Sequence, residues 1–390
     1  MKKKIIILGS TGSIGSSSLD VIKKNKRDFN IICLSTNKNY KKIFKQSFIY
    51  KVKNIIINNE KTYHKILKTN KPKGVKIFNN LDLFLNSFKK KVDYTILGIS
   101  GFAGLEPTLK IIPFTKNLCS ANKESIICGW KLIKKKLNQY NTNFIPLDSE
   151  HFSIWSLISK KNINSISSIY LTASGGPFLN IKRNKLKKVK IKDVIKHPNW
   201  NMGKKISTDS ATMMNKIFEL IEAAKIFNLS LKKFNIIIHP KSYIHAIVNY
   251  KSGLSYLVTH DTNMEIPISN SLYMHSKNKL TNKSNINFDN LNGINFIKPS
   301  SDQYPYLNLL KNIKLSESYF EIILVAINDF LVRKFLENKI SYLNMQKYLL
   351  KLININFFKK FYKLKPNNIN DINSMIDIVN NYLNNINYKK

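Results

Sequence analysis

The residues best suited to chemistry gather in the stretch 197–222, which reads HPNWNMGKKISTDSATMMNKIFELIE. Its second half has the three-and-four spacing of a helix with one buried face, formed by Met213 or Met214, Ile217, Leu220, Ile221 and Ala224. The pattern predicts a helix with Asp209 and Ser210 at its N-cap. Because the start of this helix is rich in Ser and Thr, it would suit an anion at the positive end of the dipole.

The opposite face of the predicted helix is polar. Asn215, Glu219 and Glu222 lie at i, i+4 and i+7, and Lys216 lies one turn before Glu219. On an arbitrary helix this face would be a solvated surface with a Lys–Glu pair. The preceding segment 197–203 favours a binding patch instead, since it combines imidazole, indole and thioether side chains in a Gly- and Pro-containing stretch. We expect this segment to be a loop that closes over a ligand.

A second polar constellation lies in the stretch 144–158, FIPLDSEHFSIWSLI. On an extended chain, Asp148 and Glu150 point to the same side. They could belong to an exposed turn, or they could be two oxygen ligands of a hard divalent cation with Glu219 as the third. Acidic residues number only 23 in this chain, which makes the pair harder to attribute to chance, and both alternatives stay open on the residues alone.

The N-terminal residues 4–24 predict a buried strand, a glycine turn and a helix. Gly9, Gly12 and Gly15 follow the pattern G-x-x-G-x-x-G, in which glycine lets the backbone approach a pyrophosphate at the helix N-terminus. The alternative is a tight turn in some other strand–helix–strand unit. The next predicted strand, 29–34, is followed by residues 35–39, which contain no acid and contain Lys38. Since an acid usually binds a free ribose 2′-hydroxyl, this composition favours NADPH over NADH.

Further along the chain, predicted strands alternate with helices. Strand patterns fall at residues 54–57, 75–78, 94–98, 117–120, 168–172, 234–239, 243–250 and 254–259. We expect an α/β protein with an N-terminal Rossmann-like doubly wound sheet, a central α+β catalytic domain and a C-terminal helical bundle. The predicted boundaries are 1–147 for the NADPH-binding domain, 148–275 for the catalytic, metal-binding and dimerisation domain, 276–310 for a linker and 311–390 for the helical domain. The turn 173–177 is a candidate oxyanion or phosphate nest.

Composition limits the class of protein. The chain has 390 residues, 43% of them hydrophobic, and no apolar run near the roughly 18 residues of a membrane span. The start Met1-Lys-Lys-Lys4 leaves no room for a signal peptide, and three cysteines without metal-type spacing suggest a reducing compartment, so we expect a cytoplasmic protein without a membrane partner.

The formal charge of +41 would ordinarily suggest a nucleic-acid partner. The excess is nearly all lysine, is spread along the chain and accompanies abundant Asn and Ile. These three residues have A/T-rich codons, so drift in a base-biased bacterial genome explains the charge, and we expect no nucleic-acid partner. The densest cluster, 182–196, leads directly into the loop at His197.

The chain resembles the 1-deoxy-D-xylulose 5-phosphate reductoisomerases, an NADPH-dependent enzyme family of the non-mevalonate isoprenoid pathway. The resemblance covers most of the chain and is weakest after about residue 260. It is densest in GSTGSIG (9–15), SANKES (120–125), PLDSEH (146–151), SGGPF (174–178), HPNWNMGKKIS (197–207), DSATMMNK (209–216) and IIHP (237–240). The resemblance implies rearrangement and reduction of 1-deoxy-D-xylulose 5-phosphate to 2-C-methyl-D-erythritol 4-phosphate by a homodimer with Mg²⁺ or Mn²⁺.

Position by position, the resemblance also implies roles for individual residues. The metal ligands would be Asp148, Glu150 and Glu219. The catalytic residues would be Glu150, Lys123 and His197. The sugar phosphate would be bound by Lys123, Ser149, Glu150, Ser174, His197, Ser210, Asn215, Lys216 and Glu219. NADPH would contact Thr11, Gly12, Ser13, Ile14, Asn37, Lys38, Asn39, Asn122, Glu124 and Gly203.

Two departures from the family pattern concern the cofactor site and a segment of unassigned role. Asn37 stands where the family favours glycine. In the segment 260–267, Asn263 replaces an acid and Glu265 replaces an arginine.

Two other protein classes remain as alternatives. One is a different two-domain NADP dehydrogenase, which would not need the three carboxylates. The other is a basic nucleic-acid-binding protein, which would need clustered lysines with aromatic residues on one face.

Overall fold

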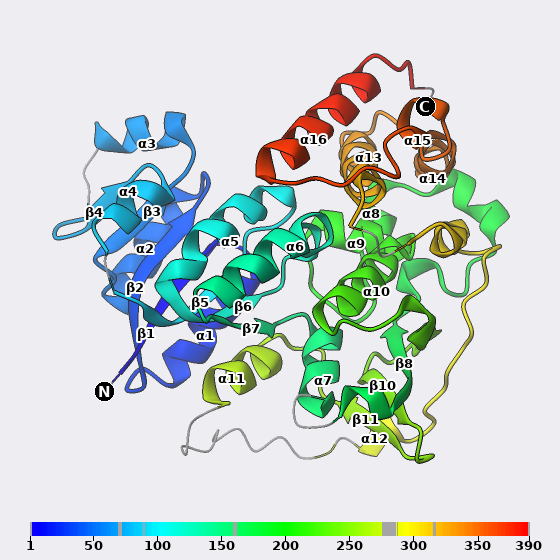
Figure 1. Ribbon diagram of the computed structural model, residues 1–390, viewed down its shortest axis with the longest axis horizontal. Helices are drawn as coiled ribbons and strands as arrows, with labels where there is room; N and C mark the ends of the chain where they lie inside the picture. Colours follow the sequence, from blue (N-terminus) through cyan, green and yellow to red (C-terminus); the bar gives the residue numbers. More distant parts are fainter. Residues whose placement is uncertain are drawn as a thin grey trace. The chain divides into compact units, whose positions relative to one another are not determined.

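The computed structural model describes residues 2–68, 72–88, 90–158, 162–274, 286, 288–314 and 317–388 (Figure 1). The chain forms two compact units. The first unit comprises Met1–Ser125, Lys131–Phe152 and Met264–Lys283, and the second comprises Ile126–Trp130, Ser153–Asn263 and Ser284–Lys390. The domain boundaries expected from the sequence stay a prediction.

The first unit is built on a seven-stranded sheet of order β4-β3-β2-β1-β5-β6-β7. All six pairings are parallel, and the strand order reverses beside β1, which confirms the predicted doubly wound α/β sheet. Ile5, Ile6 and Ile7 are all fully buried, as expected of a strand covered on both faces. The strands are β1 Lys3–Leu8, β2 Phe29–Thr36, β3 Asn54–Ile57, β4 Lys76–Phe78, β5 Val92–Leu97, β6 Thr115–Ser120 and β7 Asn143–Pro146.

Helices connect these strands, and one helix from much later in the chain joins them. They are α1 Ser13–Lys24, α2 Tyr40–Tyr50, α3 Glu60–Leu67, α4 Leu81–Asn86, η1 Phe102–Gly104, α5 Leu105–Ile111, η2 Ile112–Phe114, α6 Lys123–Gln139 and α11 Glu265–Tyr273. Figure 1 shows α11 beside α1. Lys3 Nζ donates to the carbonyl of Leu272 at 2.8 Å, and the Tyr273 hydroxyl donates to Asp28, so α11 is fastened to the first unit although the chain reaches it last.

The second unit contains a four-stranded sheet of order β11-β10-β8-β9. The strands are β8 Ile166–Ala173, β9 Phe234–Ile238, β10 Ile244–Tyr250 and β11 Ser255–Thr259. β8 pairs parallel with β9, whereas β10 pairs antiparallel with β8 and β11. Helix α10, Met214–Ile226, packs Leu220 and Ala224 into a core shared with Leu171 and Val248 of this sheet.

The remaining helices of the second unit are short except for those near the C-terminus. They are α7 Ser149–Ile158 (which begins in the first unit), η3 Ile163–Ser165, η4 Gly176–Phe178, η5 Arg183–Lys188, α8 Ile191–Val194, α9 Lys204–Ala211, η6 Leu231–Lys233, α12 Phe288–Leu291, η7 Pro305–Lys311, α13 Tyr319–Leu336, α14 Tyr342–Leu352, α15 Asn356–Lys359 and α16 Ile369–Asn384. Helix α16 buries Ile372, Met375, Val379 and Leu383. The C-terminal helical bundle is therefore confirmed, while residues 276–285 and 287 of the predicted linker lie outside the described residues.

Candidate functional site

The corner between α9 and α10 places the polar residues of the opening stretch. Helix α9 ends at Ala211, Met213 adopts a left-handed conformation (φ 67°), and α10 begins at Met214. The predicted N-cap is wrong, because Asp209 and Ser210 lie in the last turn of α9. The apolar spacing runs on without interruption across the corner, so it could not reveal a residue with positive φ. Helix α10 therefore starts beside Asn215 and Lys216, and the backbone N–H groups of Met214 and Lys216 donate to Thr212 Oγ1 (3.4 Å) and to the carbonyl of Met213 (3.1 Å).

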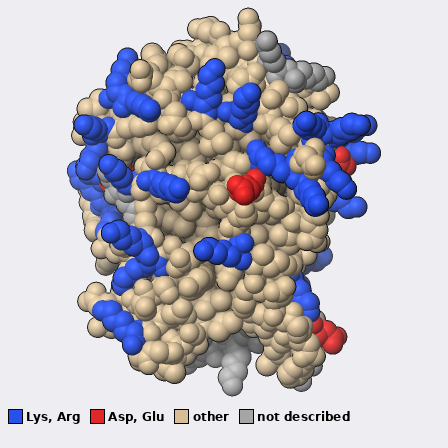
Figure 2. Space-filling view, turned by 90° about the vertical axis from the view of Figure 1, so that its right-hand side faces the viewer, with Lys and Arg blue, Asp and Glu red and all other residues tan. Residues whose placement is uncertain are grey.

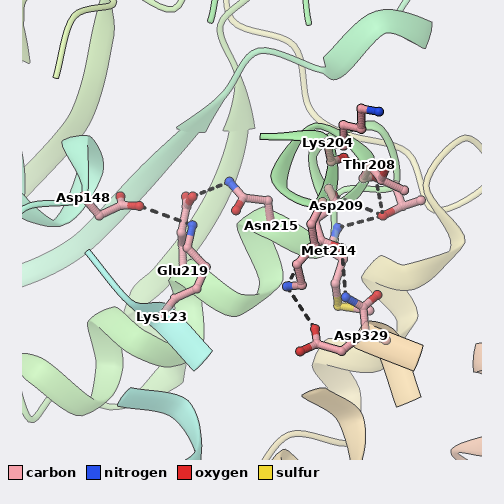
Figure 3. A network of polar contacts seen from close by, with 12 residues as sticks. Lys123, Asp148, Lys204, Thr208, Asp209, Met214, Asn215, Glu219 and Asp329 are labelled. Atoms are coloured by element: carbon pink, nitrogen blue, oxygen red, sulfur yellow. Dashed lines mark hydrogen bonds and ion pairs between the residues drawn. The ribbon is translucent and has the colours of Figure 1, made fainter. Parts of the chain in front are cut away.

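The polar face of α10 is buried, so the interpretation as a solvated surface is wrong. Glu219 is 1% exposed, accepts a hydrogen bond from Asn215 Nδ2 and pairs with Lys216 Nζ. Asn215 and Glu219 point toward each other in Figure 3. An isolated buried carboxylate is costly, and the amide and the ammonium offset that cost through a hydrogen bond and an ion pair.

A glycine turn lies against the end of α9. Strand β8 ends at Ala173, and Gly175 (φ 84°) and Gly176 (φ 67°) follow Ser174. A Cβ on Gly176 would lie 3.1 Å from both the carbonyl oxygen of Ser210 and the Cα of Ala211. Only glycine therefore lets this turn adopt its conformation and pack this closely, and the contact brings the segments of Ser174 and Ser210 together.

His197 joins the same turn. Its Nε2 lies 2.9 Å from the Ser174 hydroxyl, and its Nδ1 accepts hydrogen bonds from the backbone N–H groups of Asn199 (3.2 Å) and Trp200 (3.0 Å). Burial and the charge of Lys216 lower the pKa of His197 to about 4. Residues 197–203 form neither helix nor strand in the described range 162–274, as predicted for a loop.

The loop is fastened at two more points. Asn199 Nδ2 donates to the carbonyl of Pro240 (2.6 Å) and to Ser242 Oγ (2.8 Å). The Trp200 ring meets the His245 ring edge-on at 6.0 Å between centroids. The conformation of the loop is therefore set by residues that follow strand β9, about forty positions further along the chain.

In the first unit, the ends of β6 and β7 bring Lys123 and Asp148 together. The two strands are adjacent and parallel, so the residues after their carboxyl ends meet at one edge. Lys123 Nζ lies 3.3 Å from Asp148 Oδ2, and His151 Nδ1 lies 3.1 Å from Asp148 Oδ1. Lys123 and Asp148 are joined in Figure 3.

The expectation that Asp148 and Glu150 lie on extended chain is wrong. Strand β7 ends at Pro146, and α7 begins at Ser149, so Glu150 belongs to the first turn of a helix. Ser149 Oγ donates to Glu150 Oε2 at 2.6 Å. Residues 147–149 (Leu-Asp-Ser) form a turn from strand to helix, and the alternation of side chains along a strand does not predict such a turn.

The first unit also holds the glycine turn between β1 and α1. Gly9 has φ 82°, and a Cβ on Gly15 would lie 2.4 Å from Ser10 Cα, so a side chain at either position would disrupt the turn. Helix α1 has Gly12 as its N-cap, without a side-chain cap. Thr11 and Thr36 share a hydroxyl hydrogen bond of 2.7 Å. Backbone N–H groups at this helix N-terminus suit the pyrophosphate of a dinucleotide.

Asn37, Lys38 and Asn39, the residues predicted to read the ribose phosphate, are exposed after β2. Asn39 also caps α2 by accepting from the N–H of Lys42. Asn122 is buried, and its amide donates to the carbonyls of Ile99 (2.6 Å) and Gly101 (2.8 Å), so its side chain supports the turn after β5.

The predicted site residues divide between the two units. The first unit carries Thr11, Gly12, Ser13, Ile14, Asn37, Lys38, Asn39, Asn122, Lys123, Glu124, Asp148, Ser149 and Glu150. The second unit carries Ser174, His197, Gly203, Ser210, Asn215, Lys216 and Glu219. Within each unit the tertiary structure gathers residues that are distant in sequence.

Sequence reasoning missed Lys42 in the first unit. Its Nζ donates to the carbonyl of Thr11 (3.0 Å) and to Ser16 Oγ (2.8 Å), so it holds the glycine turn from α2. Nothing in the local pattern marks this residue among its lysine neighbours, because the contact spans about thirty residues.

The residues present fit both groups that the family resemblance implies. For a divalent cation, Asp148, Glu150 and Glu219 form a group of acidic side chains in the described residues that could hold a metal ion. Carboxylate oxygens are the ligands that Mg²⁺ and Mn²⁺ prefer. For NADPH, the first unit offers a glycine turn at the switch point of a doubly wound sheet and a lysine without a neighbouring acid after β2.

No helix in the described part of the chain is long and apolar enough to span a membrane.

The family profile described as 1-deoxy-D-xylulose 5-phosphate reductoisomerase matches residues 5–129. Two C-terminal domain profiles of the same family match residues 144–227 and 260–382.

Individual relatives agree with the profiles. The 1-deoxy-D-xylulose 5-phosphate reductoisomerase of Pelagibacter ubique is 51% identical over 97% of each chain, and that of the Wolbachia of Brugia malayi is 38% identical over 97% of this chain and 94% of its own length. Among solved structures, the Zymomonas mobilis reductoisomerase in complex with NADPH has a TM-score of 0.86 at 30% identity and covers 97% of both chains. A reductoisomerase in complex with NADPH, fosmidomycin and magnesium has a TM-score of 0.89 at 26% identity, covering 98% of this chain and 97% of its own.

Proposed function

The chain belongs to the 1-deoxy-D-xylulose 5-phosphate reductoisomerase family, and we propose that it converts 1-deoxy-D-xylulose 5-phosphate to 2-C-methyl-D-erythritol 4-phosphate with NADPH and a divalent metal ion. The observation that carries this proposal is the polar face of α10, where Asn215, Lys216 and the buried Glu219 lie together. That face joins an amide and an ammonium suited to an anion with a carboxylate suited to a cation. A phosphorylated sugar bound to a metal needs both.

We propose Asp148, Glu150 and Glu219 as the metal ligands. The support is chemical: each is an oxygen donor, and Asp148 and Glu219 each lie against an ammonium group within their own unit. A divalent ion, when bound, acidifies a sugar hydroxyl and polarises a carbonyl. Lys123 and Lys216 would then balance the remaining negative charge of the ligands and the substrate.

The phosphate end of the substrate would be held in the second unit. Ser174, Ser210, Asn215 and Lys216 lie around the turn at Gly176 and the start of α10. The positive end of the α10 helix dipole would also favour the phosphate anion. The loop 197–203, with Trp200 and Met202, would exclude water from the bound sugar.

The reacting end would be held in the first unit. Glu150 is proposed to move a proton there, because its carboxylate accepts from Ser149 in the first turn of α7 and so has a fixed position. Lys123 would orient a substrate oxygen with its ammonium group. Bound NADPH supplies the hydride for the reduction, and the turn 9–15 with Lys38 would bind this cofactor.

One assay tests the activity. We expect NADPH oxidation that requires 1-deoxy-D-xylulose 5-phosphate, stops with EDTA and returns with excess Mg²⁺ or Mn²⁺. Oxidation that persists after chelation would instead indicate a dehydrogenase of another class. Product formation without NADPH consumption would also contradict the proposal.

We also propose that the protein is a homodimer, with a second copy covering β11. β11 is an edge strand of its sheet, and Leu254, Tyr256 and Leu257 in and before it are 59%, 38% and 45% exposed. An exposed edge strand with apolar side chains favours pairing with another chain. The cytoplasmic location remains a prediction.

A further inference from the structure

The C-terminal half of the chain makes direct hydrogen bonds to the two segments that carry Ser174 and Ser210. Three side chains take part, and each comes from a different element: Tyr304 precedes η7, Asn328 lies in α13 and Tyr342 begins α14. All three are 2–3% exposed, and all belong to the second unit. The helical bundle therefore does more than cover the sheet.

The two tyrosines bind backbone carbonyls beside the serines. Tyr304 OH donates to the carbonyl of Gly175 at 2.8 Å, one residue after Ser174. Tyr342 OH donates to the carbonyl of Ala211 at 2.8 Å, one residue after Ser210. The Ala211 carbonyl lies at the end of α9, where no further turn of that helix can satisfy it, so the tyrosine replaces a missing helical partner.

Asn328 binds the residue on the other side of Ser210. Its Nδ2 donates to Asp209 Oδ1 at 2.8 Å, while Lys205 Nζ lies 3.1 Å from Asp209 Oδ2. Lys205 Nζ also lies 3.0 Å from Asp329 Oδ1, so one ammonium joins a carboxylate of α9 to a carboxylate of α13. Figure 3 shows Asp209 and Asp329 on the two sides of this contact. Because Asp209 is 2% exposed, losing these partners would leave a buried charge uncompensated.

The glycine turn transmits these contacts to the serines. A Cβ on Gly176 would already lie 3.1 Å from Ser210 O, so the turn and the end of α9 pack without spare room. Gly176 N–H also donates to Ser174 Oγ at 3.0 Å, which orients that hydroxyl. A shift of either backbone segment therefore changes the distance between the two serine side chains.

We propose that Tyr304, Asn328 and Tyr342 are positioning residues, which set the spacing of Ser174 and Ser210 for the phosphate group of the substrate. The proposal rests on the proposed function, because it assigns the phosphate to these serines. None of the three touches the substrate in this scheme. Each acts through the backbone or the carboxylate next to a serine.

Three conservative variants test the proposal: Tyr304→Phe, Tyr342→Phe and, as a matched control, Tyr306→Phe. Tyr306 is equally buried in the same region, but its hydroxyl donates to the carbonyl of Met345 at 3.3 Å and not to a residue beside either serine. We expect KM for the sugar phosphate to rise about five- to tenfold in the first two variants, the effect of one lost buried hydrogen bond. NADPH KM should be unchanged, and kcat should fall by less than about threefold because the reacting end is untouched.

A second measurement reads the position of the segments without using activity. Amide hydrogen exchange of residues 174–181 and 204–213 should accelerate in Tyr304→Phe and Tyr342→Phe but not in Tyr306→Phe. Asn328→Asp should raise the sugar-phosphate KM further, since it places a second carboxylate against Asp209. Equal KM values in all three tyrosine variants, with equal losses of stability, would overturn the positioning role.

The two measurements also separate the proposals. If the wild-type protein fails to turn over the sugar phosphate while exchange accelerates as expected, the proposed function is wrong and the three residues still hold the two segments. If turnover is normal but neither KM nor exchange responds, the positioning role is wrong and the proposed function stands.

Discussion

The hydroxyl of Ser174 lies 2.9 Å from Nε2 of His197, and this contact defines how the imidazole can act. Nδ1 accepts two backbone N–H groups, so it carries no proton in the neutral ring. The proton is therefore on Nε2, which donates to Ser174 Oγ, and that oxygen also accepts from the N–H of Gly176. His197 is thus held as a neutral hydrogen-bond donor. His197 was predicted to be both catalytic and substrate-binding. A neutral ring that donates from Nε2 is suited to binding the substrate rather than to accepting a proton from it.

Stability should depend on pH through His197. Its pKa is lowered to about 4 in the folded protein, from 6.5 for the ordinary group, so the unfolded chain binds the proton first as the pH falls. The contribution of the neutral ring is fully present above pH 6.5 and is lost progressively down to about pH 4. We expect wild-type protein to lose more free energy of unfolding between pH 7.5 and pH 5 than His197→Gln, which keeps a donor without titrating. Denaturant unfolding at both pH values measures this, and parallel losses in the two proteins would contradict it.

Glu219→Gln should keep the fold and abolish turnover. The amide is nearly isosteric but is a neutral and poor ligand for a hard cation, so we expect more than about a hundredfold loss of kcat with a parallel loss of Mn²⁺ binding by calorimetry. Glu222→Gln is the matched control, because Glu222 is buried to the same extent on the same helix. Glu219 is not a ligand if its variant keeps more than about a tenth of the wild-type rate at saturating metal.

Cofactor preference should depend on Lys38. The residue is exposed after β2, where the chain offers no acid to a ribose diol. Lys38→Ala should raise the KM for NADPH about tenfold and change the KM for NADH little, since only NADPH carries the 2′-phosphate. Lys41→Ala removes an exposed charge nearby and serves as the control. Equal effects of Lys38→Ala on both cofactors would mean that this lysine does not contact the 2′-phosphate.

The lysine excess gives a prediction about association rates. Figure 2 shows Lys and Arg side chains over much of one face of the molecule, with few acids among them. Lys185, Lys187, Lys188 and Lys190 are exposed in and after η5, a few residues before the His197 loop. A positive field can raise the association rate of an anion roughly tenfold at low salt, and it is screened beyond about 10 Å at ~0.1 M ionic strength.

Changing these four lysines to Gln should flatten the decrease of kcat/KM with added salt and leave kcat unchanged, because steering precedes chemistry. The same change at the exposed Lys359, Lys360, Lys363 and Lys365 removes equal charge from another part of the chain. We expect a modest flattening of the salt dependence of kcat/KM in the variant of the four lysines near η5 and none in the control variant. Identical salt dependence in both variants and the wild type would make the cluster ordinary solvated surface.

The dimer predicts a further result. Leu257→Lys places a charge in the middle of the exposed edge strand β11, where a second copy would bury it. Sedimentation should give a dimer for the wild type and a shift toward monomer for the variant. Phe48 on helix α2 is another exposed apolar side chain, and Phe48→Lys should leave the dimer intact. A monomeric wild type would rule out the dimer.

Local patterns predicted much of the fold. The predicted strand 54–57 has the observed bounds, and the apolar stripe of α10 is buried as the spacing indicated. Asn122 opens α6 as an N-cap, with its side chain accepting from the N–H of Ser125. These features depend on hydrogen bonds and side-chain faces within a few residues, so the sequence contains the information that defines them.

The failures have a common physical cause. The left-handed Met213 and the strand-to-helix turn at Asp148 are single backbone conformations that packing imposes on ordinary residues. Side-chain periodicity describes which face is buried and cannot report where one helix stops and another starts. The predicted N-cap at Asp209 and the predicted extended pair at 148–150 were both wrong for this reason.

The sequence by itself determined the α/β class, the glycine turn, the residue types of the candidate site and the family, because these depend on local composition and on motifs of adjacent residues. Only the tertiary structure decided that Glu219 is buried between an amide and an ammonium, that His197 carries its proton on Nε2, and that Tyr304, Asn328 and Tyr342 hold the two serine segments. These last contacts join residues more than one hundred positions apart. Such contacts form because folding brings distant backbone groups to the same buried place, where each polar atom must find a partner.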